Sequence, residues 1–150
     1  MSLLPWQEPV WQELLQRQRS AGLPHALLLT GNKGIGKHEL ALHAAQWLLC
    51  QSPAQHACGE CHSCNLWAAG SHPDFLLCVP EEGSRQIRID AIRKVNEFLA
   101  QTPQISRCQV VILSPVEVMN ANAANALLKT LEEPAGESYL LLETERFGSV

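Results

Sequence analysis

The sequence predicts an α/β fold in which a parallel sheet is flanked by helices. Short apolar runs of strand length alternate with longer segments that carry apolar residues at helical spacing. This alternation is typical of parallel sheets covered on both faces. Between the first strand and the next helix, residues 31–38 have the spacing of a phosphate-binding loop. Four cysteines between residues 50 and 64 have the spacing of a metal-binding insertion.

The composition is that of an ordinary globular domain. With 150 residues, 46% hydrophobic and 17% charged, the chain has about the length of one domain, and none of its apolar runs is long enough to cross a bilayer. The net charge of −4 argues against a dedicated nucleic-acid binder, because Lys and Arg supply most of that affinity. The first residues lack the pattern of a signal peptide. We therefore expect a cytoplasmic protein whose six cysteines bind metal or stay reduced.

The chain is expected to begin with an amphipathic helix over residues 5–19, followed by a strand over residues 25–30. His25 stands just before the apolar run of this strand, and we interpret it as a structural histidine. The helix carries an apolar stripe that favours packing against the core over a binding role. This stripe consists of Trp6, Val10, Trp11, Leu14 and Leu15.

The phosphate-loop pattern G-x-x-x-x-G-K-[ST] is nearly complete. Its glycines let backbone N–H groups point inward, its lysine reaches the outer phosphates and its last hydroxyl ligates magnesium. Gly31, Gly34, Gly36 and Lys37 fit this arrangement, but His38 replaces the hydroxyl. We expect a phosphate-loop fold with a degenerate nucleotide site, in which binding of ATP and Mg²⁺ is in doubt. Backbone amides could still hold phosphate without metal.

The cysteines at positions 50, 58, 61 and 64 are spaced C-x7-C-x2-C-x2-C. A C-x2-C turn presents two thiolates to one ion, and four thiolates form a closed tetrahedral zinc site. The competing interpretation is a set of buried or redox thiols, and His56 or His62 could replace one cysteine as a ligand. We expect a structural zinc ion that pins an insertion at about residues 50–64. Cys78 and Cys108 are expected to be small buried hydrophobes.

The second half of the chain continues the alternation with helices over residues 64–69, 91–101 and 123–131 and strands over residues 75–79, 109–113 and 139–144. Asp90 is the expected N-cap of the second of these helices. Ser114 and Pro115 follow the third strand of the sheet, where an ATPase of this architecture has an Asp for magnesium and a Glu for the attacking water. Neither carboxylate is present, which predicts loss of hydrolysis.

The segment Asn125–Pro134, together with the phosphate loop and the four cysteines, closely resembles the AAA+ domain of bacterial replicative clamp-loader subunits, over almost the whole chain. Two kinds of subunit share these features: an ATP-hydrolysing gamma/tau kind, and a delta-prime kind that does not hydrolyse ATP. His38, Ser114–Pro115 and the run His72–Phe75 favour the second kind. The alternative is an active motor of the gamma/tau type.

This resemblance implies the roles of particular residues. It places zinc on Cys50, Cys58, Cys61 and Cys64, a nucleotide at residues 31–38, and a polar sensor at Thr144. It also implies a fifth strand, a lid, a collar and a trans-acting Arg motif beyond residue 150, so we expect a shortened AAA+ domain over residues 1–150. Implied partners are the gamma/tau and delta subunits and, indirectly, the sliding clamp and primer-template DNA. A membrane partner is not expected.

Overall fold

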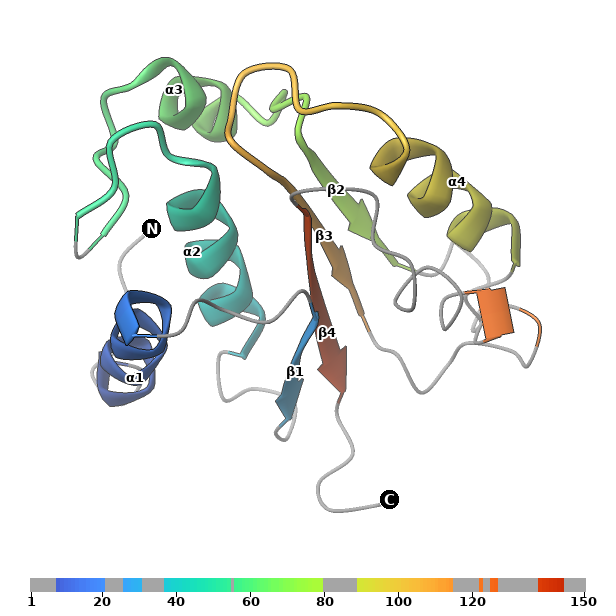
Figure 1. Cartoon of the computed structure of the whole chain (residues 1–150), viewed down its shortest axis with the longest axis horizontal. Helices are drawn as coiled ribbons and strands as arrows, with labels where there is room; N and C mark the ends of the chain where they lie inside the picture. Colours follow the sequence, from blue (N-terminus) through green and yellow to red (C-terminus); the bar gives the residue numbers. More distant parts are fainter. Residues whose placement is uncertain are drawn as a thin grey trace.

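The structure is a computed structural model that describes residues 8–20, 26–30, 37–54, 56–79, 89–114, 122, 125–126 and 138–144. Helices and strands alternate along these residues, as the sequence predicts (Figure 1). In chain order the elements are α1 (Glu8–Ser20), β1 (Ala26–Thr30), α2 (Lys37–Leu49), α3 (His62–Ala68), β2 (Phe75–Cys78), α4 (Ile89–Leu99), β3 (Gln109–Leu113) and β4 (Ser138–Thr144).

The four described strands form one parallel sheet in the order β1-β4-β3-β2. Of the described strands, β4 comes last in the sequence and lies between β1 and β3. Because all four strands run in the same direction, their carboxyl ends meet at one edge, which is where ligands bind in open sheets of this kind. At this edge Thr30 of β1 is paired with Thr144 of β4, and Leu113 of β3 with Leu142 of β4.

Each face of the sheet is covered by helices, as the alternating pattern predicts. On β3, Val110 and Ile112 belong to one core cluster with α1 and α2, whereas Val111 and Leu113 belong to a second cluster with α4. All five residues of β3 are buried. Four of these five residues are apolar, and such a run of buried apolar residues is typical of a parallel sheet with both faces covered. The expected α/β class is confirmed.

Three residues of the apolar stripe of α1, Trp11, Leu14 and Leu15, pack against the core. Trp11 and Leu15 are 1% and 2% exposed and join the core cluster on the α2 face of the sheet.

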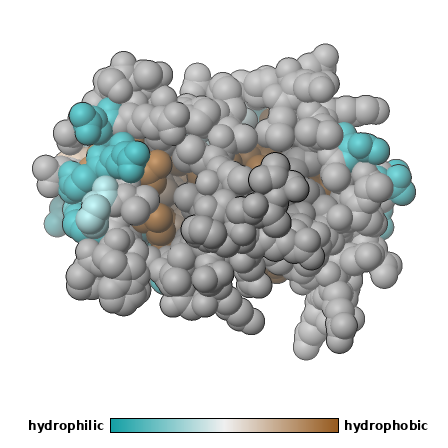
Figure 2. Space-filling model, turned by 90° about the horizontal axis from the view of Figure 1, so that it is seen from below, coloured by the Kyte–Doolittle hydropathy of each residue, from teal (hydrophilic) through white to brown (hydrophobic). Residues whose placement is uncertain are grey.

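Viewed from below, hydrophilic described residues lie toward the two ends of the molecule, and apolar ones show between them (Figure 2). In the part of the chain that the structure describes, none of the helices is long and apolar enough to span a membrane.

Some expected boundaries shift by a few residues. Asp90 is not the N-cap of its helix but lies in the first turn of α4, 3.6 Å from the guanidinium of Arg93. A carboxylate in the first turn interacts favourably with the helix dipole, so the residue type fits either position. The helix α3 begins at His62, two residues earlier than expected. His25 lies outside the described residues. Most of the helix expected over residues 123–131 also lies outside them.

Candidate functional site

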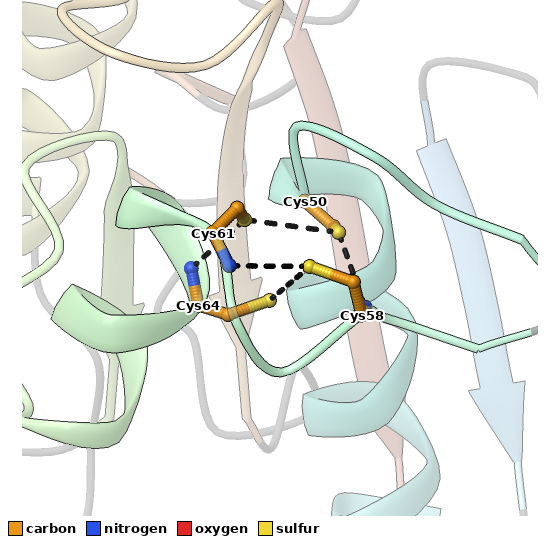
Figure 3. A group of neighbouring side chains, drawn as sticks. All are labelled: Cys50, Cys58, Cys61 and Cys64. Atoms are coloured by element: carbon orange, nitrogen blue, oxygen red, sulfur yellow. Dashed lines mark hydrogen bonds between the residues drawn. The ribbon is translucent and has the colours of Figure 1, made fainter.

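The four predicted metal ligands converge in the structure (Figure 3). Cys50 directly follows α2, Cys58 lies in the following loop, and Cys61 and Cys64 lie at the start of α3, with Cys61 as its N-cap. The sulfur atoms of these residues all lie within 4.8 Å of one another. The segment between α2 and α3 therefore brings the cysteine at the end of α2 close to the cysteines at the start of α3.

The sulfur positions fit a tetrahedral ion. A metal–sulfur distance of about 2.3 Å places neighbouring sulfurs about 3.8 Å apart in a tetrahedral zinc site. The sulfur atoms of Cys50 and Cys61 are 3.9 Å apart, and those of Cys58 and Cys64 are 4.0 Å apart. The donor set is all sulfur, which suits zinc rather than magnesium or calcium. The cluster could therefore hold a metal ion and is compatible with structural zinc.

Backbone N–H groups point at the sulfur atoms. Cys50 Sγ accepts from the N–H of Ser52 and Cys58 at 3.4 and 3.3 Å, and Cys64 Sγ accepts from that of Gly59 at 3.3 Å. The Sγ atoms of Cys58 and Cys61 also accept backbone N–H groups. Such donors stabilise thiolates and orient them toward a metal.

Three of the thiols, those of Cys50, Cys61 and Cys64, have pKa values shifted from the ordinary value. Burial raises the pKa of the Cys50 thiol to about 12, and burial also raises that of Cys64. Burial acts in the same direction on Cys61, but hydrogen bonds from the backbone N–H groups of Gln51 and Cys64 and from neighbouring thiols outweigh it and lower the pKa to about 6. Two buried thiols with high pKa values need a cation beside them to ionise at neutral pH.

A buried polar network anchors the insertion to the sheet. The carbonyl of Leu49, the last residue of α2, accepts from the hydroxyls of Ser63 and Ser106, both at 2.7 Å. His72 Nδ1 accepts the N–H of Asp74, so its Nε2 is the protonated nitrogen and donates to Ser63 Oγ at 2.7 Å. A ring nitrogen that donates to a serine hydroxyl does not act as its general base. The pair Ser63–His72 is therefore structural.

Asp74 ties the start of β2 to the segment that leads into β3. Its side chain is fully buried and accepts the backbone N–H groups of Gln104, Ile105 and Ser106 at 2.7, 2.9 and 2.9 Å. These three donors satisfy the hydrogen-bonding capacity of a carboxylate that has no contact with water. The sequence analysis used this residue only as part of the run His72–Phe75 and did not predict these bonds, because its partners lie about 30 positions away.

Neither histidine considered as an alternative ligand belongs to the four-cysteine cluster. His56 instead forms a hydrogen bond with His43 of α2, with 2.9 Å between the two ring nitrogens. Its ring is stacked on Trp11 of α1 with 6.0 Å between centroids, and its Nε2 lies 3.6 Å from Glu8. These contacts connect the insertion loop to α1 and α2. Among the described residues, the four cysteines are the group that could hold a metal ion.

The phosphate-loop residues are described only in part. Gly31, Gly34 and Gly36 lie outside the described residues, while Lys37 is the first residue of α2 and Thr144 the last of β4. Thr144 is paired with Thr30, the residue before the loop. The described residues on either side of the loop are the end of β1 at Thr30 and the start of α2 at Lys37, a strand and a helix as predicted. The roles assigned to these side chains stay predictions.

His38 has a partner that the sequence did not reveal. Its Nδ1 lies 2.8 Å from Oε2 of Glu143 in β4, and the other carboxylate oxygen accepts the hydroxyl of Ser114 at 3.3 Å. Glu143 is 1% exposed, whereas the His38 side chain is 43% exposed. Because Leu113 pairs with Leu142, the next residue after β3 comes beside Glu143. The residues that follow β3, Ser114 and Pro115, carry no carboxylate. The buried carboxylate of Glu143 in the neighbouring strand β4 lies at the same edge of the sheet.

The comparisons with known proteins agree on one family. A family model described as DNA polymerase III, delta subunit, matches residues 6–150. The DNA polymerase III subunit delta' of Pseudomonas aeruginosa is 52% identical over 141 residues, which cover 93% of this chain and 42% of that protein. The subunit of the same name from Escherichia coli is 37% identical over 145 residues, covering 96% of this chain and 43% of that protein.

A solved structure supports the same fold. The DNA polymerase III gamma subunit-related protein of Thermotoga maritima superposes with a TM-score of 0.64 at 27% identity, covering 89% of this chain and 39% of that one. The chain spans less than half the length of the curated relatives described above. On the residues that the family model and these relatives match, the chain belongs to the DNA polymerase III delta subunit family and is similar to its delta-prime members.

Proposed function

We infer that this chain is the AAA+ phosphate-loop domain of a clamp-loader subunit that does not hydrolyse ATP. On this proposal it acts as a structural member of the replicative DNA polymerase III assembly that loads the sliding clamp onto DNA. Its partners are the gamma/tau and delta subunits and, through the assembly, the clamp and primer-template DNA, and its location is the cytoplasm. The similarity to delta-prime subunits supports this role.

The observation that carries the proposal is the state of the residues on the magnesium side of the site. Phosphoryl transfer in phosphate-loop enzymes depends on a metal held by a loop hydroxyl and a carboxylate after a strand. Here His38 and Ser114 occupy those positions, and both are hydrogen-bonded to Glu143. A histidine and a serine that share one buried carboxylate form a poor ligand set for Mg²⁺, which prefers six oxygen ligands in octahedral geometry.

The four-cysteine cluster adds a structural element to this role. We assign it one zinc ion, held by Cys50, Cys58, Cys61 and Cys64, because the sulfur separations and the N–H donors described above suit that ion. A site closed by four thiolates leaves no position for water and has no catalytic part. Its function is to fix the segment between α2 and α3, which otherwise has few apolar residues to stabilise it.

The test of the proposed role is phosphate release by the purified protein, with and without Mg²⁺. We expect wild type and Lys37→Ala to release phosphate at the same background rate, because the metal ligands needed for hydrolysis are missing. A Mg²⁺-dependent rate that is abolished by Lys37→Ala would contradict the proposal. Such a result would support the second candidate, an ATPase motor of the gamma/tau type, which the superposition on the gamma subunit-related protein favours.

A further inference from the structure

Three residues from separate elements meet at the carboxyl edge of the sheet. His38 lies in the first turn of α2, Ser114 directly follows β3, and Glu143 is the next-to-last residue of β4. Glu143 shares its face of β4 with Leu141, which packs in the core cluster of α2, and its side chain therefore points toward that helix. Its two oxygens each have one of the other residues as partner, at 2.8 and 3.3 Å.

This arrangement has a parallel in metal-dependent phosphate loops. There a divalent cation joins the loop hydroxyl at the start of the helix to a carboxylate after a neighbouring strand. In this chain the same two positions are His38 and Ser114, and the Glu143 carboxylate lies between them. A carboxylate accepts hydrogen bonds and does not donate, so both neighbours donate to it. In metal-dependent phosphate loops a metal ion connects the start of the helix to the end of the strand. In this chain two hydrogen bonds to the Glu143 carboxylate make that connection.

We propose that Glu143 takes the place of the divalent cation in this chain, so that the hydrogen-bonded chain His38–Glu143–Ser114 joins α2 to the sheet and makes the site reject metal-bound polyphosphate. This inference rests on the proposed non-hydrolysing function and names the residue that sets the specificity of that site.

Charge explains the specificity. A carboxylate that is 1% exposed is screened little by water, so it repels the phosphates of a nucleotide held at the start of α2. Both of its oxygens are already engaged, one by the imidazole of His38 and the other by the hydroxyl of Ser114. A cation would have to displace the imidazole N–H before it could bind. The site is therefore unfavourable both for the metal and for the phosphate that accompanies it.

The first experiment measures ATP binding by calorimetry at low ionic strength, in EDTA and in MgCl₂. The variant Glu143→Gln keeps an oxygen to accept from His38 but removes the charge. The matched control is Glu39→Gln, which removes an exposed carboxylate from the same first turn of α2. We expect Glu143→Gln to bind metal-free ATP about tenfold more tightly than wild type and Glu39→Gln to differ less than about twofold, since exposed charges are screened.

Two results would overturn the proposal: equal affinities in the two variants, including an absence of measurable binding in both, or an affinity of wild type that rises more than about tenfold when Mg²⁺ is added. The outcome is separate from that of the phosphate-release assay. If wild type shows background hydrolysis but the charge on Glu143 does not affect binding, the inference fails and the proposed function stands.

A second experiment measures the effect of Mg²⁺, without nucleotide, on thermal unfolding. It tests the proposal even if the Glu143→Gln variant does not fold. His38→Ser removes the N–H that engages the carboxylate and supplies the missing hydroxyl. We expect millimolar Mg²⁺ to raise the Tm of His38→Ser by about 3 °C and to leave the Tm of wild type unchanged. The added change Glu143→Gln or Glu143→Ala should abolish the shift. A Tm of His38→Ser that does not respond to Mg²⁺ would overturn the proposal.

Discussion

The Oδ1 atom of Asp74 lies 2.7 Å from the backbone nitrogen of Gln104, across 30 residues of sequence. The other oxygen accepts two further backbone N–H groups, those of Ile105 and Ser106, and the side chain is fully buried. One side chain therefore fixes the segment before β3 relative to the start of β2. The segment holds Ser106, which in turn bonds to the end of α2.

The first prediction concerns this contact. Asp74→Ala should lower the free energy of unfolding by about 3 kcal/mol, because three buried N–H groups lose a charged acceptor. Asp74→Asn should cost less, since the amide keeps one acceptor oxygen. Urea unfolding at fixed metal concentration measures both, with the exposed Glu97→Ala on α4 as control. An Asp74→Ala protein as stable as that control would show that the N–H groups find other partners.

His72 predicts a pH dependence of stability. Burial lowers the pKa of His72 below its ordinary value of 6.5. The unfolded chain therefore takes up this proton at a higher pH than the folded chain does, and the free energy of unfolding falls as the pH drops below about 6.5. The His72→Gln variant lacks this titrating imidazole. Its free energy of unfolding should therefore fall less steeply than that of wild type as the pH is lowered from 7. Chemical unfolding at a series of pH values checks this, and equal slopes would contradict it.

Local sequence patterns were sufficient for the described helices and strands and for the convergence of the four cysteines. Strand β3 was predicted at its observed limits, because a run of apolar residues of strand length ends there just before Ser114 and Pro115. The convergence of Cys50 with Cys58, Cys61 and Cys64 followed from spacing alone, since a segment of 15 residues holds the whole set within reach of one ion. In both cases the information lies within a short stretch of chain.

Contacts between distant segments were not predictable in the same way. Residues 38 and 143 are 105 positions apart, and only the order β1-β4-β3-β2 brings them together. Nothing in the pattern of β4 distinguishes Glu143 from a solvent-facing residue at the end of a strand. The bond between His43 and His56 likewise depends on how the insertion loop folds back on α2. Strand order and loop path are set by packing of the whole domain, which a single sequence does not state.

The zinc assignment predicts different outcomes for two equally buried cysteines. Cys64 and Cys108 are 2% and 3% exposed. Cys64→Ser should reduce zinc content well below the one ion per chain expected for wild type, because one of four thiolates is lost. Cys108→Ser should keep about one ion, since that residue lies outside the cluster. Metal analysis of the purified proteins measures this. A wild-type protein without zinc, or equal losses in both variants, would rule out the assignment.

Two glycines have the same φ angle, but only one of them lies in the cysteine cluster. Substitutions at the two positions can therefore separate the effect of backbone strain on stability from its effect on zinc binding. Gly59 and Gly70 both have φ of 75°, and an added Cβ would meet nothing within 4 Å at either position. Gly59 lies in the turn from Cys58 to Cys61 and donates its N–H to Cys64 Sγ. Gly70 follows α3, where its N–H bonds to the carbonyl of Trp67, as at many helix ends.

The final prediction compares alanine substitutions at these two positions. Gly59→Ala and Gly70→Ala should each lower the free energy of unfolding by about 1 kcal/mol, because a left-handed conformation disfavours any residue with a Cβ. Only Gly59→Ala should also speed the release of zinc to a chelator, since relaxation of that turn moves an N–H donor and two cysteine ligands. A chromophoric chelator follows the release. Equal release rates in the two variants would mean that the turn conformation and the metal site are independent.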